Sequence, residues 1–170
     1  MTTMSEANVE TTQVYRVYIR ATPDAIWEAI TQPEWSRRYG YGGDVEYDLN
    51  AGGGFRVHAS EEFLAAGAPE IVVDGEVIEA DPPHRLVLSW RMVMDEGLAA
   101  EGFTRLTYEI EEPQEGLTKL TLIHELDGAP RLAALLRGDF ESEGAGGGWA
   151  WVLSDLKSLL ESGHAMAAPR

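Results

Sequence analysis

Two side chains on adjacent predicted strands, His124 and Tyr108, could carry acid–base chemistry. An imidazole and a phenol that reach one bound molecule can move its protons, and such a pair could enolise or cyclise a polyketide-like substrate. That chemistry requires both groups to face an open cavity. The competing interpretation of His124 is a hydrogen-bonded core histidine, which is the commoner state of a histidine on an apolar face. We favour this second interpretation and assign no catalytic residue.

Other reactive groups are sparse. The chain has no cysteine, which excludes a thiolate nucleophile, a thiolate metal site and a disulfide framework. Its four histidines are scattered, without a His-x-x-x-His pair, and the glycines around Gly146 fit neither a Walker motif nor a dinucleotide-binding motif. Ser36 and Ser89 stand outside any recognisable nucleophile motif. We therefore expect no metal and no cofactor, and an enzyme is the less favoured class.

The last helix predicted, over residues 146–161, has the most regular pattern in the chain. Its apolar residues recur at helical spacing and form one continuous stripe. The members of this stripe are Trp149, Val152, Leu153, Leu156 and Leu160. Almost everything that precedes this helix alternates like β-strand, so one long helix must cover the apolar face of one curved sheet.

The strands and short helices follow from local signals. Residues 14–19 alternate as a first strand, Thr22 and Pro23 mark a helix start, and Pro33 opens a second short helix. Six strands with short turns follow, which predicts an antiparallel meander. The remaining strands are expected at 44–49, 55–59, 71–79, 85–92, 104–111 and 117–126, with a short helical piece at 130–137. The fold class is α+β: a curved antiparallel sheet of about six to seven strands wrapped around a long C-terminal helix.

Two connections, 60–70 and 93–103, are longer than a hairpin needs, and we interpret them as loops of the kind that can cover a site. Residues 144–148 are rich in glycine and are interpreted as a hinge that lets Trp149 dock. Trp35, Tyr39 and Tyr41 are expected near the mouth of any cavity between sheet and helix.

Alternation places a set of aromatic and apolar side chains on the inner face of the sheet, facing the helix stripe. Apolar walls with a few polar groups are typical of a small-molecule pocket. The alternative is that the same side chains simply fill the core, as inward aromatic residues most often do. The candidate ligand-binding residues are Trp35, Tyr39, Phe55, Trp90, Tyr108, His124, Trp149 and Leu153.

Composition narrows the possible partners. The 170 residues include 29 acidic and 13 basic side chains, a net charge of −16 that disfavours binding to nucleic acid or to an anionic membrane surface. No apolar run is long enough to span a membrane, and no signal pattern opens the chain, so we expect a cytoplasmic protein. We predict one domain over residues 13–162 between flexible tails at 1–12 and 163–170.

With these elements in place, the chain resembles the START-like, helix-grip superfamily called SRPBCC, and within it the group named after the C-terminal domain of the activator of Hsp90 ATPase. The segments that carry the resemblance are Ile19–Glu34, Gly52–Phe55, Gly75–Trp90, Leu120–Glu125 and Gly148–Trp149. They are mostly caps, turns and core aromatics, so the resemblance specifies the helix-grip fold more firmly than the function.

The superfamily includes lipid and hormone binders, aromatic cyclases and co-chaperones, and the resemblance therefore implies three hypotheses. The first is a binding protein for a small hydrophobic or amphipathic ligand. The second is a cyclase- or hydrolase-type enzyme that uses the same cavity, and the third is a co-chaperone linked to Hsp90. The assembly is expected to be a monomer or a homodimer.

Overall fold

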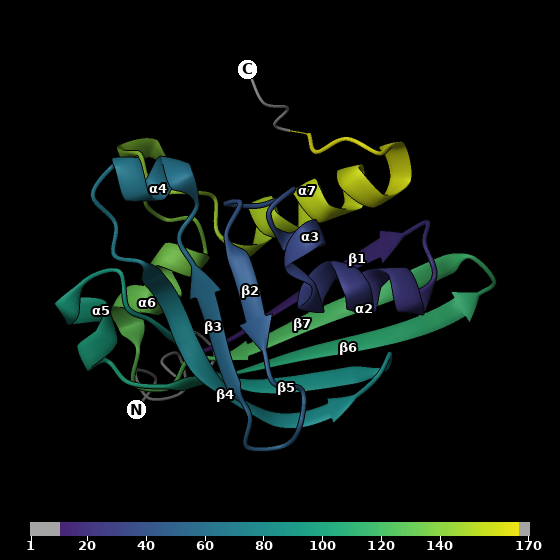
Figure 1. Ribbon diagram of the computed structural model, residues 1–170, viewed down its shortest axis with the longest axis horizontal. Coiled ribbons are helices and arrows are strands. Elements are labelled where there is room, and N and C mark those ends of the chain that lie inside the picture. The colour runs from purple at the N-terminus through teal and green to yellow at the C-terminus, as the bar shows by residue number, and fades with distance from the viewer. Residues whose placement is uncertain (1–10, 167–170) are drawn as a thin grey trace, which may run out of the picture.

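One antiparallel sheet organises the chain in the computed structural model, which describes residues 11–166 (Figure 1). The sheet has seven strands in the order β1-β7-β6-β5-β4-β3-β2, so every neighbouring pair except β1 and β7 is consecutive in sequence. The strands are β1 (Thr12–Ile19), β2 (Asp44–Tyr47), β3 (Gly54–His58), β4 (Ile71–Asp81), β5 (Arg85–Met92), β6 (Thr104–Gln114) and β7 (Leu117–Glu125). The predicted meander is confirmed.

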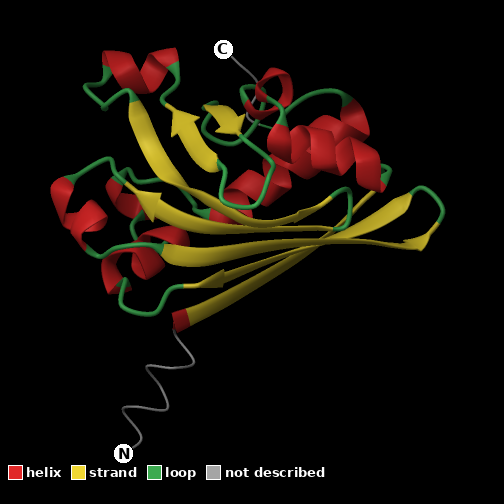
Figure 2. Cartoon of the chain, turned by 60° about the horizontal axis from the view of Figure 1, so that its bottom comes forward, coloured by secondary structure: helices red, strands yellow, loops and turns green. Residues whose placement is uncertain are grey.

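The helix that follows the first strand and the last helix of the chain lie over the same face of this curved sheet (Figure 2). After β1 come α2 (Pro23–Thr31) and α3 (Pro33–Ser36), and the last element is α7 (Trp149–Ser162). The Thr22 hydroxyl accepts a hydrogen bond from the amide of Ala25 and caps α2, with Pro23 at its first position, as the sequence predicts. The predicted α+β helix-grip class is confirmed.

The inner face of the sheet supplies most of the core. Strands β5, β6 and β7 place every second side chain against α2 and α7, and the fully enclosed residues include Leu88, Leu106 and Leu122. On α7, Leu153 and Leu156 are buried against this face. The period-two pattern in the strands and the helical stripe in α7 therefore meet in one core.

The two long connections differ from the expectation of loops. Each holds one short helix, α4 (Glu61–Ala65) and α5 (Glu96–Ala100). Ser60 caps α4 by accepting from the Phe63 amide, and Asp95 caps α5 by accepting from the Leu98 amide. We interpreted both segments as loops because they are rich in Ala, Gly and Glu. Ser60 and Asp95 were the available signals, since Ser and Asp are preferred at the N-cap of a helix.

The chain ends with α6 (Pro130–Leu136), where a short helix is predicted, then the 3-10 turn η1 (Glu141–Glu143), and then α7. Strand β1 begins at Thr12, two residues before the predicted start. The predicted tails fall chiefly on residues 1–10 and 167–170, which lie outside the described residues. Within residues 11–166, no helix has both the length and the apolar character to cross a membrane.

Candidate functional site

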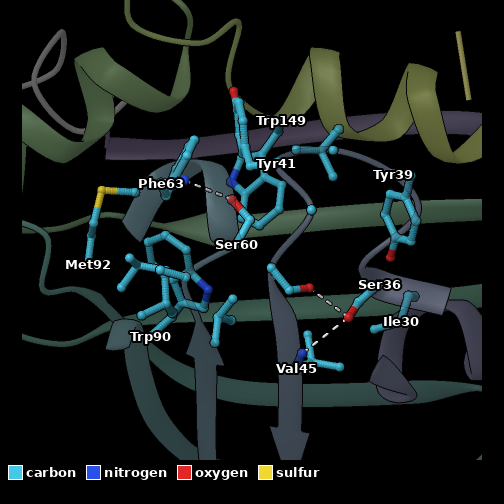
Figure 3. Close-up of a pocket in the computed structure, with 18 of the residues that line it drawn as sticks. Ile30, Ser36, Tyr39, Tyr41, Val45, Ser60, Phe63, Trp90, Met92 and Trp149 are labelled. Atoms are coloured by element: carbon cyan, nitrogen blue, oxygen red, sulfur yellow. Dashed lines mark hydrogen bonds between the residues drawn. The ribbon is translucent and has the colours of Figure 1, made fainter. Parts of the chain in front are cut away.

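A pocket of about 180 Å³ lies between the sheet and the start of α7 (Figure 3). Its walls come from β2 to β6, from the segment 39–43 that follows α3, from α4 and from α7. The aromatic members of the wall are Tyr39, Tyr41, Tyr47, Phe55, Phe63, Trp90, Tyr108 and Trp149. Aliphatic side chains such as Val57 and Val152 complete it. The wall is therefore chiefly apolar, with a few polar atoms on aromatic rings.

Gly148 fixes the position of α7 over the pocket. This residue precedes the helix with φ 74° and ψ −149°, a conformation that only glycine adopts without strain. A β-carbon here would overlap the carbonyl oxygen of Leu136, so α6 and the start of α7 pack backbone to backbone. The Gly148 amide donates to the Tyr41 hydroxyl at 3.0 Å. At Gly148 the predicted hinge segment is thus close-packed against α6, and this contact places Trp149 in the interior.

Trp149 reaches His124, which is fully buried on β7. The Trp149 indole Nε1–H donates to His124 Nδ1 at 3.1 Å, and His124 Nε2 lies 2.7 Å from Thr104 Oγ1. An indole nitrogen can only donate, so Nδ1 accepts and the ring proton sits on Nε2. Thr104 then accepts from His124 and donates to the backbone oxygen of Trp90 at 2.8 Å. We call Thr104, His124 and Trp149 the histidine network.

The histidine network holds His124 in its neutral form. Burial lowers the pKa of His124 from 6.5 to about 3, because the charged imidazolium would lose its hydration. Both ring nitrogens are already in hydrogen bonds within the protein. In this arrangement His124 orients Trp149 and has no nitrogen left to take a proton from a bound molecule.

The hydroxyls in the pocket wall fall into two groups. Tyr39 donates to the backbone oxygen of Ala29 at 2.8 Å, and Ser36 donates to the backbone oxygen of Gly43 at 2.8 Å. The hydroxyls of Tyr47 and Tyr108 form no hydrogen bond with any described residue. Burial raises the pKa of Tyr108, and it raises the pKa of Tyr47 with a further contribution from the nearby Tyr108 and Tyr39 hydroxyls. All of these phenols are therefore protonated at neutral pH.

The structure brings five of the eight predicted site residues to the pocket wall: Tyr39, Phe55, Trp90, Tyr108 and Trp149. Three lie elsewhere. Trp35 packs on the outside of the core beneath the Arg38 guanidinium, 4.9 Å from the ring centre. Leu153 is buried in the core, and His124 stands behind Trp90 and Trp149.

Sequence reasoning missed several wall residues. Tyr47 stacks on Phe55 with ring centres 4.8 Å apart, and the alternation of residues 45, 47 and 49 was the signal that could have included it. Phe63 was missed because its segment was interpreted as a loop, and the Ser60 cap was the available signal. Tyr41, expected near the mouth, does line the pocket. Among the described residues, no group of three or more His, Cys, Asp or Glu side chains could hold a metal ion.

Comparison with known proteins gives the chain a family. Residues 20–161 match the family model described as "Activator of Hsp90 ATPase homolog 1-like protein". This match spans most of the chain and agrees with the resemblance seen in the sequence. A comparison with curated proteins found no match.

Solved structures share the fold at low sequence identity. CalU16 from Micromonospora echinospora is 22% identical, with a TM-score of 0.61 over 93% of this chain and 69% of that one. The Aha1 dimer from Colwellia psychrerythraea is 18% identical, with a TM-score of 0.59 over 89% and 97% of the two chains. PFC0360w, an HSP90 activator from Plasmodium falciparum, is 23% identical, with a TM-score of 0.53 over 68% and 73%. At these identities the likeness concerns the fold.

Proposed function

The chain belongs to the family of activator of Hsp90 ATPase homolog 1-like proteins, and from the pocket beneath α7 we propose that it is a cytoplasmic binding protein for a small hydrophobic or amphipathic molecule. The observation that carries this proposal is the pocket itself. Its volume of about 180 Å³ is somewhat larger than an engineered apolar cavity of about 150 Å³ that binds benzene. Apolar walls with a few polar groups are the usual composition of a ligand site.

Ethylbenzene is a suitable probe because it carries one ring and no polar atom. The expected result is a saturable shift of the amide resonances of Gly40, Gly43 and Val152, recorded by NMR on the purified protein. Val152→Phe places a larger side chain in the pocket wall and should abolish the shift. Val14→Phe is the matched control, because Val14 is 46% exposed on β1. Absence of a saturable shift in the unmodified protein with ethylbenzene, and also with the amphipathic probes acetophenone and benzoate, would overturn the proposal.

Hsp90 activation is a second candidate, and the family match favours it. The test is the ATPase rate of an Hsp90 with and without the purified chain. A stimulation that survives Val152→Phe would make the chaperone role independent of the pocket. An unchanged ATPase rate would remove this candidate and leave the binding proposal intact.

An acid–base enzyme is less favoured, because the hydrogen bonds of His124 already occupy both ring nitrogens. Tyr108 remains in the wall but would have no basic partner in His124. If a turnover activity is found, its survival in His124→Asn would exclude His124 as the base.

A further inference from the structure

The pocket wall lacks charge. Among the described residues that line it, none is Asp, Glu, Lys, Arg or His. An ionised ligand would lose its hydration there and find no opposite charge, which is costly in an apolar setting. The −16 net charge of the chain adds long-range repulsion against anions. The wall therefore favours an uncharged occupant.

Three polar side-chain groups of the wall neither donate nor accept a hydrogen bond with any described residue. They are the Tyr47 hydroxyl, the Tyr108 hydroxyl and the Trp90 indole nitrogen, which we call the donor set. Trp90 as a whole is only 5% exposed, and Figure 3 shows its indole nitrogen on the pocket side of the ring. Every fully enclosed side-chain nitrogen or oxygen among the described residues has a hydrogen-bond partner. The donor set therefore reaches accessible space.

The donor set contrasts with the other polar groups of the same wall. The hydroxyls of Ser36 and Tyr39 donate to backbone oxygens, and the Tyr41 hydroxyl accepts from Gly148. Water in the empty pocket can hydrogen-bond to a group that reaches accessible space, so an occupant that displaces this water must offer a hydrogen-bond partner in its place or bind more weakly. An indole N–H can only donate, and a phenol donates readily. An acceptor oxygen, such as that of a carbonyl or ether, is therefore the one partner that suits all three groups.

Building on the proposed binding function, we propose that the pocket selects uncharged molecules of about one ring that carry an acceptor oxygen, and that a hydroxyl or indole N–H of the donor set (Tyr47, Trp90 and Tyr108) recognises this oxygen. The pocket volume of about 180 Å³ limits the size of the ligand, and the absence of charged side chains from the wall favours a ligand without charge. The donor set supplies the specificity, because a site built to hydrogen-bond an oxygen rejects the analogue that lacks it.

Three probes of similar size test this assignment: ethylbenzene, acetophenone and benzoate. Acetophenone replaces one methylene of ethylbenzene by a carbonyl, and benzoate adds a charge. The dissociation constant of each is measured by NMR titration at pH 7.5 on the unmodified protein and on Tyr47→Phe and Tyr108→Phe. Tyr18→Phe is the matched control, since Tyr18 is 51% exposed on β1.

The expected result is tighter binding of acetophenone than of ethylbenzene and the weakest binding for benzoate. Tyr47→Phe or Tyr108→Phe should weaken acetophenone by roughly three- to tenfold, the value of one neutral hydrogen bond, and leave ethylbenzene within about twofold. Tyr18→Phe should change neither. The assignment is overturned if ethylbenzene binds as well as acetophenone, if neither tyrosine variant separates the two probes, or if benzoate binds as tightly as acetophenone. Failure of all three probes to bind would instead remove the binding function itself.

Discussion

The histidine network and the donor set meet where Trp90 contacts His124 and Trp149, yet the two groups are opposite in their hydrogen bonding. In the histidine network, Trp149, His124 and Thr104 pass hydrogen bonds in one direction to the Trp90 backbone oxygen. In the donor set, the hydroxyls of Tyr47 and Tyr108 and the indole nitrogen of Trp90 form no hydrogen bond with any described residue. Burial alone does not separate the two groups, because Trp90 and Trp149 are 5% and 8% exposed.

This difference separates residues that support a pocket from residues that could recognise its contents. A network in which every donor and acceptor is paired holds its side chains in place. Removing one member leaves the others without a hydrogen-bond partner and so lowers stability. A group that has no protein partner and reaches the pocket contributes little to the stability of the empty protein and remains available to hydrogen-bond an occupant. If this comparison is right, substitutions in and around the histidine network reduce stability, whereas those in the donor set leave stability nearly unchanged.

The largest effect is expected at the junction that brings Trp149 to the histidine network. Gly148→Ala places a methyl group against the Leu136 carbonyl and forces an alanine to φ 74°. Overpacking and backbone strain together should lower the free energy of unfolding by about 4 kcal/mol. Urea unfolding followed by tryptophan fluorescence measures the change.

Gly144→Ala is the matched control for this substitution. Gly144 also has a positive φ, 95°, but a β-carbon there meets no atom within 4 Å. Only the strain remains, so a loss of about 1 kcal/mol is expected. Equal losses for Gly144→Ala and Gly148→Ala would show that the contact with α6 does not position the helix.

The next effect concerns the histidine network itself. His124→Ala leaves a cavity and removes the partners of Trp149 and Thr104, which should lower the free energy of unfolding by about 3 kcal/mol. His84→Ala, in the exposed turn after β4, should change it by less than about 0.5 kcal/mol. A small loss at His124 would mean that its hydrogen bonds contribute little to holding the fold.

The pH dependence of stability gives a third, smaller effect. The pKa of His124 is about 3 in the folded protein and near 6.5 when unfolded, so between these values only the unfolded state binds the proton. Stability should therefore fall as the pH drops below 6.5, by about 2 kcal/mol at pH 5 compared with pH 8.

Carboxylates act in a lower window. Their hydrogen-bonded partners lower the pKa values of Glu46, Asp139 and Glu161, so the stability they contribute is lost as the pH falls through the range below about 4.5. The slope between pH 5 and 6.5 therefore isolates His124. Urea unfolding across this interval should show the slope in the unmodified protein and not in His124→Asn. A slope that persists in the variant would assign it to another group.

Sequence reasoning recovered the sheet, α2, α7 and the inner faces, because the apolar period and the capping residues are local signals. It placed Tyr108, His124 and Trp149 on one inner face but could not tell which of these side chains line the pocket and which fill the core. That separation depends on which hydrogen atoms find acceptors, and Trp149 reaches His124 across 25 positions of sequence. This contact depends on the backbone conformation at Gly148, which the alternation of apolar and polar residues does not predict.

The smallest effects are expected in the donor set, and they distinguish it from Tyr39, another tyrosine of the same pocket wall. Tyr108→Phe and Tyr47→Phe remove hydroxyls without a protein partner, so the free energy of unfolding should stay within about 0.5 kcal/mol of the unmodified value. Tyr39→Phe removes the hydrogen bond to the Ala29 backbone oxygen and should cost about 1 kcal/mol more. Thermal and urea unfolding of the ligand-free variants measure both. If Tyr108→Phe costs as much as Tyr39→Phe, its hydroxyl already has a partner in the empty protein, and the contrast with the histidine network fails at that residue.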